Sequence, residues 1–302
     1  MTANPVELNW SSGPAEKLGE PYLGGSWGGA VMSHDHQELD LSLMAGVTDR
    51  GLRHKQNEDA MELAVVPAGD GPILVAVVCD GVSTSVRPAE ASLAAAQAAA
   101  EVLRTAAQDG TDLTEASSAA VRAAENAVAG LAASPGGVGS ATFVSAVITS
   151  SAATLCWLGD SRAYWLGAPA TPDPELAAQQ LTRDDSLAQE MVTAGLLPQD
   201  EALSSPHAHV VTRWVGADPG EAAPHVVTFE PPGPGVLMLC SDGLWNYQPD
   251  AAKLAELAMP AALTDPLGAA QALVTFAIEA GGRDNITVAL APFPPGSTAG
   301  SA

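Results

Sequence analysis

Short, almost continuously apolar runs recur along this sequence, and most of them end or begin at an aspartate. Runs of this length are typical of β-strands that are buried on both faces. Three runs lead into Asp80, Asp160 and Asp242, one follows Asp59, and one follows Asp284. We therefore expect a strand-rich core with several carboxylates at the ends of its strands.

Two alanine-rich stretches predict helices over residues 88–107 and 114–133, and Pro88 suits the first turn of the first helix. Both stretches contain few large apolar side chains, so we expect the two helices to pack closely through small residues. Further strands are expected over residues 141–149, 153–159, 162–167, 225–230 and 236–241, and further helices over residues 185–194, 250–258 and 266–280. Two sheets covered by helices on their outer faces would account for this order.

The two ends of the chain differ in composition from the part between them. Residues 1–40 contain Gly, Pro and Ser and show no sustained period, so we expect an N-terminal extension that is flexible or docks by its tryptophans. Residues 41–293 are expected to form the domain, and residues 294–302 a disordered tail.

The charge and hydropathy of the chain exclude several classes of partner. A net charge of −23 repels nucleic acid and anionic membrane surfaces. No apolar stretch reaches the roughly eighteen residues of a membrane span, and the N-terminus lacks the basic region and apolar core of a signal peptide. We expect a cytoplasmic monomer. Cys79, Cys156 and Cys240 lie inside apolar runs without metal-ligand spacing, as small buried side chains do.

The strand-end aspartates raise an electrostatic question. Carboxylates that meet beside an apolar core repel one another by several kcal/mol unless a divalent cation lies between them. Taken singly, a pair such as Asp80-Gly81 is far more often a turn than a metal site. Turn chemistry does not explain an aspartate at the end of nearly every buried run. The joint pattern therefore predicts a metal-dependent enzyme that handles phosphate.

A small group of cations stands just before the first of these acids. Arg50, Arg53 and Lys55 are three of only twelve Lys and Arg residues, and they fall within six residues before Glu58. In an acidic chain such clustering suggests a place that holds an anion next to a cation site. A solvated basic turn is the alternative when the three residues are taken alone.

The order of eight short motifs resembles that of the PP2C-type (PPM) family of metal-dependent protein serine/threonine phosphatases, in its bacterial form. The likeness covers roughly residues 45–291, and its order and coverage are highly specific. The motifs are TDRG at 48–51, NEDA at 57–60, CDG at 79–81, GSAT at 139–142, LGDSRAY at 158–164, LTRDDS at 181–186, CSDGLW at 240–245 and RDNITV at 283–288.

The resemblance implies a fold and an activity. The fold is α+β, a four-layer α-β-β-α sandwich in which two central, mostly antiparallel β-sheets are flanked by helices, with the site at one edge of the sheets. The activity is that of a protein-serine/threonine phosphatase, which hydrolyses phosphoserine and phosphothreonine in proteins with a metal-activated water and no phosphoenzyme. A phosphorylated protein is then the substrate, and a cognate serine/threonine kinase is the expected opposing partner in signalling.

Carried over by motif, the resemblance also implies two Mn²⁺ or Mg²⁺ ions and a third, weaker ion that bacterial members often show. Asp80 would bridge the two ions, and Asp160 would bind the third. Oxygen-only ligation with retained waters suits Mn²⁺ or Mg²⁺ and disfavours zinc. The expected metal ligands are Glu58, Asp80, Gly81, Asp160, Asp242 and Asp284.

The residues expected to act on the substrate are Arg53, His54 and Asp59. In the family an arginine four residues before the glutamate of the Asn-Glu-Asp motif clamps the phosphate, but here that position holds His54, with Arg53 just before it. Either Arg53 reaches round, or a cationic His54 takes this role. Val82 stands where eukaryotic members often carry a histidine, so no general acid comes from that position.

A catalytically weak or inactive regulatory relative is the alternative function. Such a protein would bind a phosphoprotein or another partner through the variable flap, which corresponds to residues 196–222. The retained Asp80, Asp242 and Asp284 argue against it, because a lost activity removes the reason to hold mutually repelling carboxylates together. Histidines in or near the flap, such as His225, are expected to be surface residues.

Overall fold

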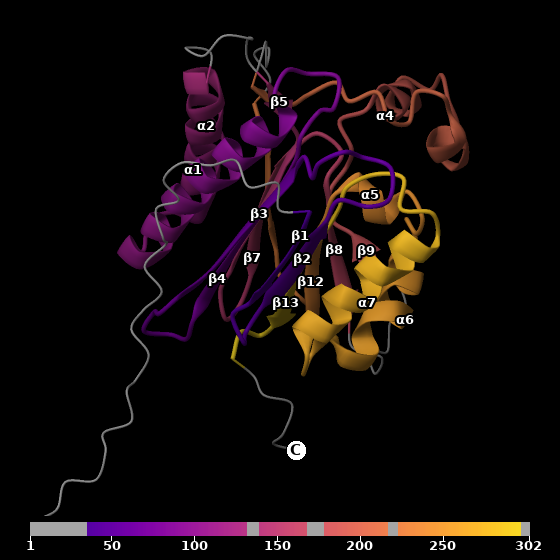
Figure 1. Ribbon diagram of the computed structural model, residues 1–302. Coiled ribbons are helices and arrows are strands. Elements are labelled where there is room, and N and C mark those ends of the chain that lie inside the picture. Colours follow the sequence, from indigo (N-terminus) through magenta and orange to yellow (C-terminus); the bar gives the residue numbers. More distant parts are fainter. Residues whose placement is uncertain (1–34, 132–138, 168–177, 217–222, 297–302) are drawn as a thin grey trace, which may run out of the picture. The chain divides into compact units, whose positions relative to one another are not determined.

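Two β-sheets lie face to face, and helices cover the outer face of each (Figure 1). The computed structural model describes residues 35–131, 139–167, 178–216 and 223–296. Most of the predicted N-terminal extension and of the predicted tail lies outside these residues. Every strand pairing within the described residues is antiparallel, so the expected α-β-β-α sandwich with antiparallel sheets is confirmed.

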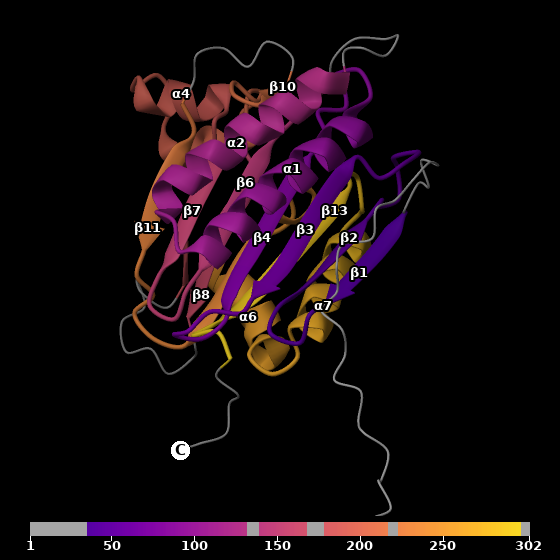
Figure 2. The same ribbon diagram turned by 90° about the vertical axis from the view of Figure 1, so that its left-hand side faces the viewer.

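The first sheet has five strands in the order β11-β7-β6-β4-β3, and helices α1 and α2 cross its outer face (Figure 2). Its strands are β3 (Asp59–Val66), β4 (Ile73–Asp80), β6 (Phe143–Ile148), β7 (Ala153–Leu158) and β11 (His225–Phe229), and its helices are α1 (Pro88–Asp109) and α2 (Leu113–Gly130). Ala95 and Ala99 of α1 and Ala120 and Ala124 of α2 are fully buried in one cluster, which confirms the expected packing through small residues.

The second sheet has six strands in the order β1-β2-β13-β12-β8-β9, and α5, α6 and α7 follow its strand β12 along the chain. Its strands are β1 (His36–Asp40), β2 (Ala45–Asp49), β8 (Arg162–Gly167), β9 (Ala178–Gln180), β12 (Gly235–Cys240) and β13 (Ile286–Phe293). The helices are α5 (Asp242–Trp245), α6 (Ala251–Ala262) and α7 (Pro266–Glu279). None of the helices in the described residues is both long and apolar enough to cross a bilayer.

The remaining short elements lie at one end of the sandwich. They are β5 (Ser140–Ala141), which pairs with β10 (Val215–Gly216), the helix α4 (Leu187–Thr193) and the 3-10 helix η2 (Gln199–Ser204). The helix α4 and η2 belong to the segment between β9 and β10, and both ribbon views show α4 at the same end of the molecule as β5 or β10 (Figures 1 and 2).

The apolar runs are buried on both faces because each sheet lies between a helical layer and the other sheet. In β4, Val75 and Val77 pack against α1 and α2, while Leu74, Ala76 and Val78 pack between the sheets. This alternation needs apolar side chains at every position, which is why the run shows no two-residue period. The three cysteines are free and buried, as expected from their places in such runs.

The N-terminal boundary predicted at residue 40 is wrong by at least one strand. Residues His36–Asp40 form β1, which pairs along its whole length with β2 at the edge of the six-stranded sheet. The sequence HQELD is polar, and four of its five residues are exposed. An edge strand of this kind is formed by backbone pairing, so it has no hydrophobic pattern that could reveal it.

Candidate metal centre

All five strand-end aspartates lie at one edge of the sandwich. Asp59 begins β3 and Asp80 ends β4, and the two residues are direct cross-strand partners. In the first sheet the register continues from β4 through β6 to β7, and a turn then leads to β8 of the second sheet. There β8 pairs with β12 and β12 with β13, so that the turn before β8, the end of β12 and the start of β13 reach this same edge. These three positions carry Asp160, Asp242 and Asp284. The antiparallel order thus brings together residues that are far apart in the sequence.

The carboxylates of this acidic cluster influence one another strongly. Burial raises the pKa of Asp80 well above its ordinary value, and the negative charges of the other four aspartates raise this pKa further. Burial, followed by the charges of Asp160, Asp284 and Asp59, has the same effect on the pKa of Asp242. Like charges that raise each other's pKa in this way are stabilised by a divalent cation between them.

Two further aspartates of the cluster titrate near neutrality without a cation. Burial raises the pKa of Asp160 to about 7, and the charge of Asp184 adds to this effect while Arg162 opposes it. Burial likewise raises the pKa of Asp59 to about 6, although hydrogen bonds from Thr287 and Ser241 oppose the increase. Perturbation of this size in several adjacent groups is typical of a functional site.

Asp59 has one oxygen that is fully engaged and one that has no partner. The hydroxyls of Ser241 and Thr287 both donate to Asp59 Oδ2, each at 2.7 Å. Asp59 Oδ1 is buried and has no hydrogen-bond partner, and the same is true of Asp242 Oδ1. Buried carboxylate oxygens without a partner are rare because each carries a desolvation cost. Two of them in one acidic cluster fit a hard cation, which takes oxygen ligands.

The cluster is not a closed cage. In the described ranges of the chain, no three His, Cys, Asp or Glu side chains form a ready-made coordination shell.

The turn after β4 approaches the loop before β3 very closely. The N–H of Gly81 donates to the carbonyl of Glu58 at 3.0 Å. A Cβ atom at position 81 would lie 2.6 Å from that carbonyl oxygen and 2.7 Å from the carbonyl oxygen of Pro88. Only glycine fits there, since no other residue allows this approach. Glu58 is therefore held beside Asp80 by the backbone.

Asn285 fixes the loops of the site, although it was not predicted to be a site residue. Its side-chain oxygen accepts a hydrogen bond from the N–H of Glu58 at 2.8 Å, and its amide nitrogen donates to the carbonyl of Arg50 at 2.8 Å. Ser241 and Thr287 were missed in the same way. All three lie inside the motifs beside the expected ligands, so their position in the motif was the available signal.

A cleft of about 690 Å³ adjoins the acidic cluster and is lined by Arg53, His54, Lys55, Gln56, Glu58, Ser83 and Arg283. We call it the cationic cleft. The two nitrogens of the His54 ring face carboxylates, with Nε2 3.1 Å from Asp284 Oδ1 and Nδ1 3.9 Å from Glu58 Oε2. Arg53 is exposed and makes no ion pair or hydrogen bond with any described residue. The structure thus brings both candidate clamp residues to the cluster, but in different environments.

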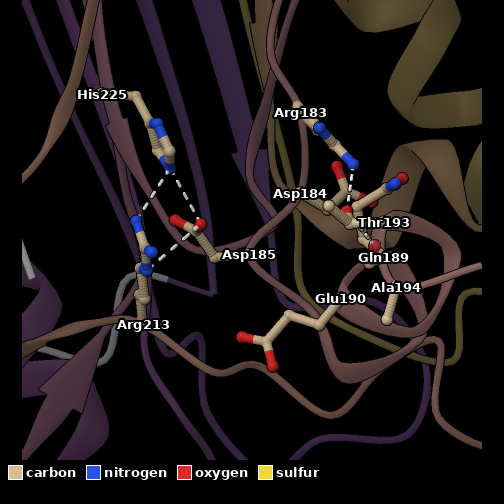
Figure 3. A pocket seen from close by; sticks show the side chains of 9 residues that line it. All are labelled: Arg183, Asp184, Asp185, Gln189, Glu190, Thr193, Ala194, Arg213 and His225. Carbon is tan, nitrogen blue, oxygen red and sulfur yellow. Dashed lines mark hydrogen bonds and ion pairs between the residues drawn. The ribbon is translucent and has the colours of Figure 1, made fainter.

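A second pocket, of about 360 Å³, is lined by residues of the segment around α4, by Arg213 and by His225 (Figure 3). Among its lining residues, Asp185 accepts a hydrogen bond from His225 Nε2 at its Oδ1, at 2.9 Å, and one from the N–H of Gly159 at its Oδ2, at 3.1 Å. The His225 ring stacks on Trp157 with ring centroids 4.8 Å apart. His225 was expected to be a plain surface residue, but it is half-buried and helps hold the turn that carries Asp160.

Comparisons with known proteins agree with this geometry. No family model matches the chain. The chain is 33% identical over 150 residues to the serine/threonine phosphatase stp of Listeria innocua, in an alignment that covers 49% of this chain and 55% of that protein. The chain thus spans about half the length of the curated relatives it matches, or less.

Solved structures are similar over most of the chain. The PPM Ser-Thr phosphatase MsPP from Mycobacterium smegmatis, in complex with cacodylate, is 28% identical, with a TM-score of 0.63 over 83% of this chain and 97% of that one. The catalytic domain of the serine/threonine protein phosphatase PstP, in complex with two manganese ions, is 25% identical, with a TM-score of 0.58 over the same shares of the two chains. In its motifs and its fold, the chain is similar to bacterial PP2C-type (PPM) serine/threonine phosphatases.

Proposed function

We propose that this chain hydrolyses phosphoserine and phosphothreonine in proteins and that the reaction depends on Mn²⁺ or Mg²⁺. The observation that carries the proposal is the cluster of five buried or half-buried aspartates, two with an unpartnered carboxylate oxygen, beside a cleft lined by cations. The names of the similar proteins, and the two manganese ions in the PstP structure, support the same reading.

Within this proposal, Asp80, Asp242, Asp284 and the carbonyl of Gly81 would hold the two ions, and Asp160 would hold a third, weaker ion. Glu58 would act through water in the same region. When bound, such cations neutralise charge on the phosphoryl oxygens and lower the pKa of a water molecule, so that it attacks phosphorus at neutral pH.

The chain's own residues supply orientation. The hydroxyls of Ser241 and Thr287 leave Asp59 only one free oxygen, so they direct that oxygen into the cluster. Asn285 holds Glu58 against the loop that carries Arg53. A side chain positioned in this way loses little conformational freedom when the substrate binds, and such preorganisation contributes to the rate.

We assign the phosphate clamp to Arg53 rather than to His54. Arg53 has no carboxylate partner and is free to turn toward the phosphoryl oxygens, whereas His54 is already held between Asp284 and Glu58. A guanidinium also matches the geometry of a phosphoryl group with two parallel hydrogen bonds.

Replacing Arg53 by glutamine is therefore expected to raise KM for a phosphothreonine peptide by about tenfold, the cost of one charge-assisted hydrogen bond. Steady-state kinetics at saturating Mn²⁺ measure this effect. The comparison variant is His54→Gln, which should change the Mn²⁺ concentration for half-maximal rate more than it changes KM. If His54→Gln raises KM and Arg53→Gln mainly changes the Mn²⁺ concentration for half-maximal rate, His54 is the phosphate clamp.

The proposal is tested by assaying the purified chain with Mn²⁺ and with EDTA on p-nitrophenyl phosphate, a phosphothreonine peptide, sugar phosphates and nucleotides. Manganese-dependent hydrolysis that favours the peptide is the expected result. If no substrate is hydrolysed with Mn²⁺, the chain is not a phosphatase, and the regulatory function is the alternative. If a small molecule is preferred over the peptide, the substrate class is different. A cognate kinase, a monomeric state and a cytoplasmic location remain predictions attached to this proposal.

A further inference from the structure

The cationic cleft holds more unpaired positive charge than one phosphoryl group needs. Its side chains of Arg53, Lys55 and Arg283 make no ion pair or hydrogen bond with any described residue. Elsewhere in the described chain, arginines such as Arg104 and Arg162 pair with carboxylates. In a chain with 12 Lys and Arg against 35 Asp and Glu, three unpaired cations in one cleft are an unusual concentration.

The cleft is built from two loops that the backbone holds together. The N–H of Leu52 donates to the carbonyl of Gly282 at 2.7 Å, and the side-chain amide of Asn285 donates to the carbonyls of Arg50 and Gln56 at 2.8 and 3.2 Å. One loop carries Arg53 and Lys55, and the other carries Arg283 directly before Asp284. These hydrogen bonds hold the two loops side by side at the edge of the acidic cluster.

We propose that Lys55 and Arg283 bind further anionic groups of the substrate, so that the preferred substrate is a phosphoserine or phosphothreonine flanked by acidic or phosphorylated residues. This inference rests on the proposed phosphatase activity, in which Arg53 already holds the reacting phosphoryl group. Both side chains are exposed, so they can reach a peptide that lies across the cleft.

Because the whole molecule is strongly negative, acidic substrates need a local group of cations such as that of the cationic cleft. At −23 the chain repels an acidic segment at long range, and only nearby cations offset this repulsion. Contacts between exposed charges are individually weak, but a substrate with two or three additional anionic groups gains from each of them. The expected consequence is selectivity among phosphopeptides rather than tight binding.

The test compares three phosphothreonine peptides that differ only in the flanking residues: neutral, aspartate-rich, or carrying a second phosphothreonine. With Mn²⁺, kcat/KM of the wild-type chain should be about tenfold higher for both anionic peptides than for the neutral one, the sum of a few exposed charge contacts. A rise in ionic strength from about 0.05 M to about 0.3 M should reduce this preference, because the charges are exposed.

Arg283→Glu and Lys55→Glu should each lower the preference for the anionic peptides at least threefold, and the double variant should reverse it. Lys253→Glu is the matched control: it makes the same change of charge at an exposed position of α6 that does not line the cleft, so it should keep the wild-type preference. Thermal melting confirms that each variant is folded.

Two outcomes distinguish a failure of this inference from a failure of the proposed phosphatase activity. If the neutral peptide and p-nitrophenyl phosphate are hydrolysed but the three peptides have equal kcat/KM, the inference is wrong and the phosphatase stands. If none of these compounds is hydrolysed with Mn²⁺, the proposed function itself has failed. A preference confined to the doubly phosphorylated peptide would support the inference and identify the second anion as a phosphoryl group. A preference that Lys253→Glu also removes would overturn the inference in favour of an effect of overall charge.

Discussion

Asp80→Asn is expected to lower kcat for Mn²⁺-dependent hydrolysis of a phosphothreonine peptide by at least about 10³-fold, a loss of roughly 4 kcal/mol of transition-state stabilisation. The same substitution is expected to make the metal-free protein more stable. The Asp80 carboxylate is buried and faces the charges of four other aspartates, so an uncharged side chain of the same shape removes repulsion.

The two effects are measured by steady-state kinetics with Mn²⁺ and by urea unfolding with EDTA. Asp70→Asn is the matched control, since Asp70 is exposed and lies between the same two strands at the far end from the cluster. It should change neither quantity. Lower stability of the Asp80→Asn variant in EDTA would contradict the like-charge cluster, and retained activity would remove Asp80 from the metal site.

The stability of the metal-free protein is expected to fall as pH rises from about 4 to about 8, and bound Mn²⁺ should reverse this trend. The pKa of Asp160 is raised to about 7 and that of Asp59 to about 6, and those of Asp80 and Asp242 are also raised well above their ordinary value. In the unfolded chain aspartates titrate near pH 3.9. Between these values the folded state binds more protons, so the stability present at low pH is lost as pH rises through the folded pKa values.

The fall should exceed about 2 kcal/mol, since one unit of pKa shift in a single group already corresponds to about 1.4 kcal/mol. Urea unfolding in EDTA at several pH values measures it. Mn²⁺ at about a hundred times its dissociation constant should restore about 2.7 kcal/mol at neutral pH, because it binds only the folded state. The double variant Asp80→Asn, Asp242→Asn should have a shallower pH dependence. A flat profile for the wild-type chain in EDTA would mean that these carboxylates do not repel one another.

The buried strands and the long helices could be predicted from local sequence because each is surrounded by apolar partners. The run that ends at Asp80 and the run that ends at Cys240 became β4 and β12, and the alanine-rich stretch from Pro88 became α1. The polar edge strand β1 could not be predicted, because only its pairing with β2 makes it a strand. The local hydrophobic pattern of a sequence indicates which residues are buried, and most residues of an exposed edge strand are not buried.

The site shows the same division. The motifs indicated candidate ligands and the cations Arg53 and Lys55 along the chain, but they could not indicate what each side chain contacts. Asp185 and His225 form one network although they are 40 residues apart. Their partnership depends on how β11 returns beside the turn that carries Asp160, so no periodicity within either segment could have indicated it.

By itself, the sequence determined which acids stand at strand ends and that they are too many for ordinary turns, because strand periodicity and turn chemistry are set by neighbours along the chain. Only the tertiary structure decided that the five aspartates share one edge and that Asp59 keeps a free oxygen. The partners of Asp59 are Ser241 and Thr287, 182 and 228 residues away, and antiparallel pairing brings them together. The charge and burial that set the pKa of a carboxylate come from such distant neighbours, so they appear only once the sheets have formed.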